Sequence, residues 1–297
     1  MTLKIAFIGC VKSSETFLNI LIKMPEVEVC AVITKKTSKV NSDFVDLKYI
    51  CEEHSIPCQY ETINDREKSS IFLKKYSLDL IYCFGWSYLL DETVLSIPKI
   101  GVIGFHPALL PRNRGRHPII WALALGLEET GSTFFKMDAF ADSGPIISQE
   151  KIDILADDKA VDLYEKIMNK ASKQIKIFTL DFLNQEANFL YQDNSEATYW
   201  RKRNQADGLI DWRMSAQEIY NLVRSLSPPY PCAEFKLGST YIKVPECYIA
   251  TEKYPNDIEP GFILKKDTDS LLIKVAGQDA VLIKKLKLKD KIDGDYL

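Results

Sequence analysis

The strongest constraint on the fold of this chain is the alternation of short apolar runs with amphipathic stretches over its first 150 residues. Residues 4–9 and 27–34 are apolar runs of strand length, and residues 14–23 between them show helical periodicity. Two further apolar runs follow at residues 78–84 and 100–105. Strands that alternate with helices predict crossover connections and a mostly parallel sheet covered on both faces. The sequence therefore predicts an α/β, Rossmann-like domain in this half of the chain.

The pattern changes near residue 205. A helical stretch over residues 215–225 is followed by a Pro-Pro-Tyr-Pro turn at residues 228–231, and then by short alternating runs separated by Asn-, Asp- and Gly-containing turns. Runs of this kind predict a small antiparallel β domain. We therefore expect two domains, over residues 1–204 and 205–297.

Composition and charge narrow the classes of protein to which the chain can belong. Apolar residues make up 46% of the chain and charged residues 27%, which is ordinary for a globular protein. No apolar window reaches the roughly 18 residues of a membrane-spanning helix, and the apolar stretch at the N-terminus is too short for a secretory signal. We expect a cytoplasmic protein with no membrane partner. The net charge of −3 argues against a nucleic-acid partner, although a local basic patch could offset it.

Two kinds of site are disfavoured by the sequence. The seven cysteines are scattered and form no Cys-x-x-Cys pair, so no metal site is expected. After the first predicted strand, Gly9 is followed by Cys10 and Val11, which does not match the Gly-x-Gly-x-x-Gly of a dinucleotide-binding turn. The second strand ends without an acidic residue for a ribose hydroxyl, so an NAD or FAD site is not expected either.

One segment, residues 104–118, concentrates the residues that can do chemistry. His106 comes directly after a predicted strand and is followed by Pro107 and Pro111, which restrict the backbone around it. Ligands in α/β folds bind beyond the carboxyl ends of the strands, which is where this histidine falls. Asp142 follows 36 positions later in a loop after another apolar run. Taken alone, a histidine that caps a strand is the simpler interpretation of His106.

Together, these elements resemble the N10-formyltetrahydrofolate-dependent formyltransferases. The likeness rests on His-Pro-x-Leu-Leu-Pro-x-x-Arg-Gly from His106 onward and on Asp-Ser-Gly at Asp142. Residues 206–212, 223–226 and 229–233 follow the order found in the two-domain members, which include methionyl-tRNA formyltransferase and the sugar N-formyltransferases. The resemblance is strongest to the sugar enzymes. It implies a formyltransferase catalytic domain over residues 1–204 and an open, OB-like C-terminal β-barrel.

The resemblance also implies a mechanism. An amine attacks the formyl carbon of N10-formyltetrahydrofolate, with His106 as general base and Asp142 supporting the imidazole. The family has an asparagine two residues before this histidine to hold the formyl oxygen, whereas this chain has Gly104. Protonated His106, a main-chain N–H at Gly104 or the side chain of Asn113 could replace it. A catalytically silent relative is an alternative.

Folate is expected, by resemblance, to lie against main-chain groups of residues 84–90 and 139–142, which can provide an apolar slot with a few polar contacts. Ordinary core packing is an equally good explanation for the two aromatic residues Trp86 and Tyr88. The expected cofactor-binding residues are Phe84, Gly85, Trp86, Tyr88, Leu89, Leu90, Ala139, Ala141 and Asp142.

The acceptor site is expected around residues 199–203, because Tyr and Trp offer stacking surfaces while Arg and Lys offer cations for a nucleotide diphosphate. A solvated basic segment between domains is the alternative. The expected substrate-binding residues are Arg114, Arg116, His117, Tyr199, Trp200, Arg201, Arg203, Arg224 and Tyr230.

We therefore expect a formyltransferase acting on a nucleotide-linked amino sugar, of the 4-amino-4,6-dideoxy hexose type, for surface-polysaccharide synthesis. Methionyl-tRNA formyltransferase and a silent folate- or sugar-binding relative are the rivals, and hydrolysis of the formyl donor is a third. By analogy with the sugar enzymes, a homodimer is expected.

Overall fold

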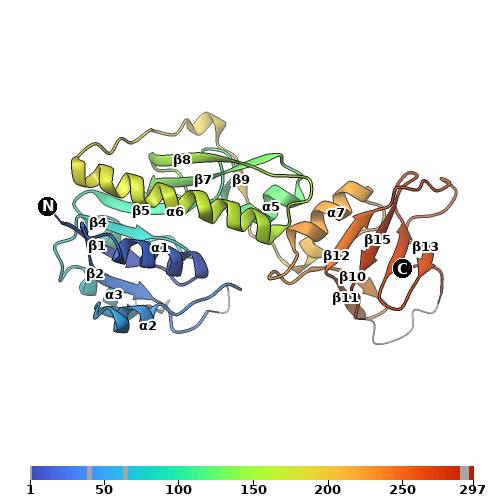
Figure 1. The fold of residues 1–297 in the computed structure, drawn as a ribbon, viewed down its shortest axis with the longest axis horizontal. Helices are drawn as coiled ribbons and strands as arrows, with labels where there is room; N and C mark the ends of the chain where they lie inside the picture. Colours follow the sequence, from blue (N-terminus) through green and yellow to red (C-terminus); the bar gives the residue numbers. More distant parts are fainter. Residues whose placement is uncertain (1, 39–41, 63–65, 288–293) are drawn as a thin grey trace. The chain divides into compact units, whose positions relative to one another are not determined.

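The computed structural model describes residues 2–38, 42–62, 66–287 and 294–297 (Figure 1). The chain forms two compact units. The first unit consists of Met1–Gly115, Gly131–Ile152 and Lys166–Tyr199, and the second of Arg116–Thr130, Asp153–Glu165 and Trp200–Leu297. Two short segments from the N-terminal part of the sequence thus belong to the second unit, and the domain boundary expected near residue 205 stays a prediction.

The first unit is built on a seven-stranded sheet with the order β3-β2-β1-β4-β5-β7-β8. Strands β2, β1, β4 and β5 pair in parallel, β3 pairs in parallel with β2, and β5 pairs antiparallel with β7. The expected Rossmann-like class is therefore confirmed. The strands are β1 Leu3–Ile8, β2 Val27–Thr34, β3 Cys58–Tyr60, β4 Leu80–Cys83, β5 Gly101–His106, β7 Glu129–Lys136 and β8 Ile146–Asp153. The helices are α1 Lys12–Ile22, α2 Lys48–Glu53, α3 Arg66–Leu73, α4 Glu92–Leu95 and α6 Ala160–Asn184.

Both faces of this sheet are covered. Successive side chains of each strand point to opposite faces, so each face has its own group of buried residues. One face carries an aromatic cluster in which Phe17 of α1 and Phe178 of α6 contact Phe134 of β7. Phe84 joins the same cluster, 5.2 Å from Phe17 between ring centroids. The other face packs against α3 and α4 through a second group of buried residues: Ala6, Ile8, Ala31, Ile33, Leu73, Leu78, Ile81, Cys83, Val94 and Val102.

Helix α2 is shorter than the apolar periodicity of its segment predicts. Residues 44–53 have a helical pattern, but α2 begins only at Lys48. Phe44 instead forms an isolated antiparallel bridge with Val11, and the N–H of Val45 donates to the carbonyl of Cys10. These tertiary hydrogen bonds, which local periodicity does not encode, take the place of the first helical turn.

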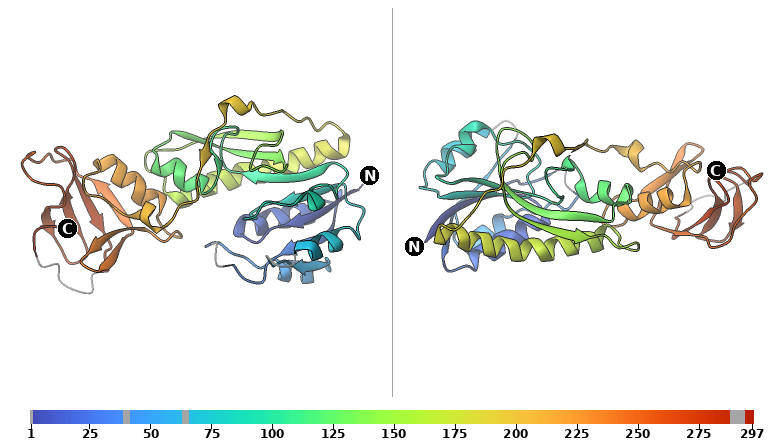
Figure 2. Two further views of the ribbon diagram at one scale, coloured as in Figure 1. Left: turned by 180° about the vertical axis from the view of Figure 1, so that it is seen from behind. Right: turned by 90° about the horizontal axis from the view of Figure 1, so that it is seen from above.

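The segment that follows α6 returns along the sheet toward the strand that carries Tyr199 (Figures 1 and 2). It contains the short helix η1 Asn194–Glu196 and the strand β9 Tyr199–Trp200. Strand β9 pairs with β6, Arg114–Gly115. This return segment, residues 185–199, therefore reaches the end of the histidine motif.

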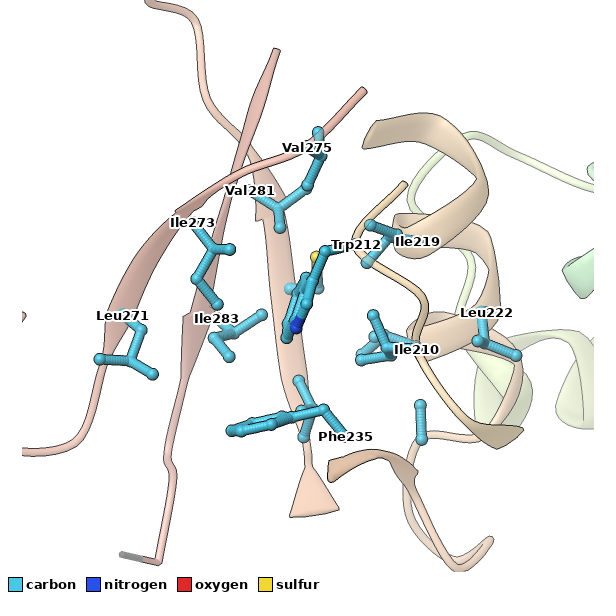
Figure 3. Packing of buried hydrophobic residues seen from close by; sticks show 14 of the residues in the cluster. Ile210, Trp212, Ile219, Leu222, Phe235, Leu271, Ile273, Val275, Val281 and Ile283 are labelled. Carbon is cyan, nitrogen blue, oxygen red and sulfur yellow. The ribbon is translucent and has the colours of Figure 1, made fainter. Parts of the chain in front are cut away.

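The second unit is built around an apolar core (Figure 3). Trp212 lies between Ile219 of α7 and the strand residues Phe235 and Ile283. Helix α7, Ala216–Ser225, begins with a capping box between Ser215 and Glu218 and packs on α5, Pro118–Ala124. Strands β10 Ala233–Leu237, β11 Thr240–Val244, β12 Glu246–Ile249, β13 Ile263–Lys266, β14 Leu271–Lys274 and β15 Ala280–Lys284 form a two-stranded and a four-stranded sheet. All of these strand pairs are antiparallel, as expected.

Within the described ranges, none of the helices has the length and apolar character that crossing a bilayer requires. Over the same residues, no group of three or more His, Cys, Asp or Glu side chains is arranged to hold a metal ion. The cysteines are all free thiols.

Candidate active site

His106 is the last residue of β5, where this strand reaches the carboxyl edge of the parallel sheet. The residue is 5% exposed, and its Nε2 lies 2.8 Å from the main-chain carbonyl oxygen of Asn113. Because a carbonyl oxygen only accepts hydrogen bonds, Nε2 carries a hydrogen and donates it. In the neutral ring the lone pair is therefore on Nδ1, which is the nitrogen that can take up a proton.

Asp142 lies in the turn between β7 and β8. Its Oδ2 accepts the main-chain N–H of Gly115 at 2.8 Å and lies 3.5 Å from Nδ1 of His106. The bond from Gly115 fixes which carboxylate oxygen faces the ring. When Nδ1 gains a proton, this carboxylate stabilises the resulting imidazolium. The structure thus brings together the two residues expected to carry the chemistry.

Gly104, two residues before the histidine, is enclosed by the sheet. It lies opposite Cys83 of β4 on one side and opposite Phe135 of β7 on the other. Its N–H therefore points into a strand ladder, which makes a main-chain donor for the formyl oxygen at this position unfavourable. A Cβ at Gly104 would come within 2.9 Å of both Met137 Cγ and Phe135 Cζ. Met137 fills the space that a side chain at this position would occupy.

Comparison with protein families decides what kind of enzyme this is. Residues 3–178 match the formyl transferase model, and residues 202–295 match the model of the formyl transferase C-terminal domain. The chain belongs to the formyl transferase family. This membership confirms the expected enzyme class, and the expected formyl donor, N10-formyltetrahydrofolate, fits this family.

This formyltransferase is similar both to a methionyl-tRNA formyltransferase and to sugar N-formyltransferases. The methionyl-tRNA formyltransferase of Staphylococcus epidermidis is 32% identical over 304 residues, which covers 98% of this chain and 96% of the relative. Among solved structures, the sugar 3N-formyl transferase WlaRD, in the presence of dTDP and 5-N-formyl-THF, has a TM-score of 0.71 at 17% identity, covering 98% of this chain and all of the other. The N-formyltransferase from Helicobacter canadensis, in complex with folinic acid and dTDP-3-aminofucose, has a TM-score of 0.72 at 18% identity, covering 96% and 100%. These structural likenesses support the fold.

Among the residues expected to hold folate, Phe84 and Gly85 have structural roles, whereas the others reach the surface. The ring of Phe84 is buried in the aromatic cluster, and its carbonyl accepts the Ser14 hydroxyl at 2.6 Å, so this residue serves packing. Gly85 has a φ of +67°, and a Cβ there would lie 2.1 Å from Val11 Cγ2, so only glycine fits this turn. The remaining expected residues are at least partly exposed: Trp86, Tyr88, Leu89, Leu90, Ala139 and Ala141.

Trp86 and Tyr88 are ordered by a cation as well as by packing. The Nζ of Lys35 lies 4.4 Å from the centroid of the Trp86 ring and 4.0 Å from that of the Tyr88 ring. Trp86 also packs against the apolar residues on the α3 and α4 face of the sheet. Both rings are therefore held in place while remaining partly exposed.

In the second unit, two arginines expected to bind the acceptor stack on an indole. The guanidinium carbons of Arg201 and Arg203 lie 5.3 and 4.5 Å from the ring centroid of Trp121 in α5. Arg201 also forms an ion pair with Asp207, and this hydrogen-bonded guanidinium holds the pKa of that carboxyl well below its usual value. Burial and the cations Arg116, Arg203 and Lys202 lower the pKa of His117. The cations of this group are suited to bind an anion. We call the group the basic platform; it consists of Arg116, His117, Trp121, Arg201, Lys202 and Arg203.

Other residues expected at the acceptor site are used inside the protein. Arg224 is buried, and its Nη1 donates to the carbonyls of Leu155 and Asp158 at 3.0 and 3.2 Å. Tyr230 packs against the core of the second unit. The Trp200 carbonyl accepts the N–H of Arg116 at 3.0 Å. Arg114 is 1% exposed and bonded to side chains of the return segment.

Two residues with a place at these sites were missed in the sequence. Trp121 lies within an apolar helical run that reads as core, and Gln192 carries no chemical signature. Each becomes recognisable only through tertiary contacts, the first with Arg201 and Arg203 and the second with the loop of Asp142. No local pattern in the sequence could have found them.

The packing at Gly104 gives a testable prediction. Replacing Gly104 by Asn, the residue of the family motif, should lower the free energy of unfolding by about 1–3 kcal/mol, because the new side chain overpacks against Met137. Met137→Ala should also destabilise, by leaving a cavity. The double variant should lose less than the sum of the two single losses, by at least about 0.5 kcal/mol. Denaturant unfolding of the four proteins measures this cycle, and additive losses would show that Met137 does not occupy the space.

Proposed function

We propose that this formyltransferase transfers the formyl group of N10-formyltetrahydrofolate to the amine of a nucleotide-linked amino sugar. The observation that carries the formyl transfer is the pairing of His106 with Asp142 at the carboxyl edge of the sheet. The sugar acceptor is supported by the basic platform and by fold similarity, over nearly the full length of both chains, to enzymes solved with dTDP or dTDP-3-aminofucose. A net charge of −3 fits a small-molecule acceptor better than a tRNA.

In this proposal His106 is the general base. Its Nε2–H is held by the carbonyl of Asn113, so Nδ1 accepts the proton that the attacking amine loses as the new C–N bond forms. Asp142 holds the resulting imidazolium by charge. Nδ1 then returns the proton to the folate nitrogen as the bond from that nitrogen to the formyl carbon breaks. One proton and one formyl group thus move in opposite directions between the two amines.

The formyl oxygen needs a hydrogen-bond donor as it gains negative charge. Because the N–H of Gly104 points into the sheet, two of the three expected donors remain, the protonated imidazole and the side chain of Asn113. The Oδ1 of Asn113 accepts the hydroxyl of Thr198 at 3.3 Å, which leaves its Nδ2 as the donor end. We assign the role to this pair of neighbouring groups.

For the acceptor, the platform of the second unit offers guanidinium groups for a diphosphate and an indole for stacking. The 4-amino-4,6-dideoxy hexose expected from the sequence is our preferred sugar, and the 3-amino sugar of the Helicobacter canadensis complex is the alternative position. A role in surface-polysaccharide synthesis, a cytoplasmic location and a homodimer accompany this proposal.

Methionyl-tRNA is the second candidate acceptor. It is favoured by one observation, the 32% identity to the Staphylococcus epidermidis enzyme over nearly the whole of both chains. Recognition of tRNA would depend on phosphate contacts and would weaken steeply as salt rises.

The proposed function predicts tetrahydrofolate release that depends on an amino sugar. With N10-formyltetrahydrofolate and a panel of UDP- and dTDP-linked 3-amino and 4-amino sugars, one sugar should drive release and gain the mass of a formyl group. His106→Ala should lower kcat by about 10²-fold or more, because general base catalysis is lost. Transfer only to methionyl-tRNA, release without any acceptor, or no turnover alongside ligand binding would each contradict the sugar assignment. They point to the tRNA enzyme, a hydrolase and a silent binder, respectively.

The acceptor platform makes a prediction that does not depend on turnover. The pKa of His117 is lowered by burial and by Arg116, Arg203 and Lys202, so the imidazole loses its proton at a lower pH than an exposed histidine does. A bound dTDP brings negative charge to these cations and should raise this pKa. An NMR titration of the histidine ring resonances measures the shift, with the exposed His54 as internal control. An unchanged His117 in the presence of bound dTDP would place the nucleotide elsewhere.

A further inference from the structure

The loop of Asp142 adopts a backbone conformation that needs support from outside. Asp142 has a φ of +54°, and Asn113, which holds the ring of His106, has a φ of +64°. Both lie in the left-handed region, which costs a non-glycine residue of the order of 1 kcal/mol even where, as with Asn and Asp, the side chain tolerates it. Surrounding contacts must therefore select these conformations.

Four of the hydrogen bonds to these two loops come from one element, the return segment. Its Thr198 accepts the N–H of Asn113 on its hydroxyl at 2.8 Å and the N–H of Arg114 on its carbonyl at 2.9 Å. Gln192 of the same segment donates from Nε2 to the carbonyl of Asp142 at 2.9 Å and to that of Gly144 at 2.7 Å. The histidine loop and the aspartate loop are thus held against the same segment.

The side-chain amide of Gln192 has only one productive orientation. Its Oε1 accepts two N–H groups of Arg114, from Nε at 3.2 Å and from Nη2 at 2.7 Å. A guanidinium only donates and a carbonyl only accepts, so Oε1 must face Arg114 and Nε2 must face the Asp142 loop. Arg114 therefore sets the direction in which Gln192 donates.

Arg114 itself is buried at a cost. It is 1% exposed, and its hydrogen bonds go to the neutral side chains of Gln192, Asn194 and Tyr199. Over the described ranges, no carboxylate lies within ion-pair distance of it. Burial of a guanidinium without a counter-charge is a weak way to stabilise a fold. Its fixed fork of donors is, however, well suited to hold an amide in one orientation.

We propose that Arg114 and Gln192 are positioning residues for formyl transfer. Arg114 orients Gln192, and Gln192 holds the left-handed turn at Asp142, so that the carboxylate meets Gly115 and Nδ1 of His106. The proposal rests on the proposed roles of His106 and Asp142. Arg114, expected from the sequence to bind substrate, acts through the return segment instead.

Positioning of this kind has a defined kinetic signature. Displacement of a catalytic group by about 1 Å can slow the chemical step by about 10²-fold. The side chain of Gln192 bonds to main-chain carbonyls of the Asp142 loop. We therefore expect kcat to fall by about 10–100-fold in Gln192→Leu, while KM for the amino acceptor stays within about 3-fold. A role in binding would instead raise KM.

A second variant separates positioning from stability. Gln192→Glu keeps an acceptor oxygen for Arg114 but replaces the two donations to the Asp142 loop by a carboxylate oxygen. Its melting temperature should stay within about 4 °C of the wild type, while kcat falls as in Gln192→Leu. The matched control is Gln174→Leu. Gln174 is buried and bonded to Ser132 of β7 and Ser148 of β8, neither of which belongs to the two loops, so this change should lower stability and leave kcat unchanged.

Amide hydrogen exchange tests the proposal without turnover. The N–H of Gly115 donates to the Asp142 carboxylate, so its exchange in Gln192→Leu and Gln192→Glu should be about 10-fold faster than in wild type and in Gln174→Leu. Unchanged Gly115 exchange, or wild-type kcat in Gln192→Glu, would overturn the proposal. If Gly115 exchange rises but no variant, wild type included, transfers formyl groups, the positioning holds and the proposed function fails.

Discussion

The arrangement of the candidate active site depends on one hydrogen bond, from Nε2 of His106 to the carbonyl of Asn113. It fixes the ring, decides which nitrogen carries the hydrogen in the neutral form and directs the other nitrogen toward Asp142. The carbonyl itself is placed by a left-handed residue that the return segment holds. In the proposed mechanism, this histidine acts as a base with a defined direction because a main-chain carbonyl holds its ring. The position of a main-chain group changes little when side chains are substituted, so such groups can hold a catalytic ring in a fixed orientation.

The same edge of the sheet explains how the chain accommodates glycine at position 104. In the family motif an asparagine stands there, whereas here the space is filled by Met137, with Phe135 beside it. The change concerns packing and chemistry together, since a side chain at this position would face the same side of the sheet as His106. Activity would then depend on donors that are already near the ring, the Asn113 amide and the protonated imidazole. Because the strands are closely packed, the residues at positions 104 and 137 are coupled, and a side chain at position 104 requires a smaller one at position 137.

Much of the fold could be predicted because it rests on local patterns. The parallel strands β1, β2, β4 and β5 and the helices α1 and α7 follow from apolar runs and helical periodicity. The pairing of His106 with Asp142 follows from a motif with fixed spacing. What could not be predicted depends on contacts distant in the chain. The sequence alone presents Arg114 as a candidate to bind an anion. In the fold it is buried and hydrogen-bonded to the return segment, about 80 residues later in the chain. The start of α2 also depends on a distant contact, since the bridge between Phe44 and Val11 takes the place of a first helical turn.

The most direct test of this account is the tautomer of His106. The chain has three histidines, so ¹⁵N-detected NMR of the imidazole nitrogens can be assigned with single His→Asn variants. At a pH where the ring is neutral, the account predicts a protonated Nε2 and an unprotonated Nδ1 for His106. That result would leave Nδ1, beside Asp142, as the atom that accepts the amine proton. A protonated Nδ1 with a bare Nε2 would contradict the hydrogen bond to Asn113 and with it the assignment of the base.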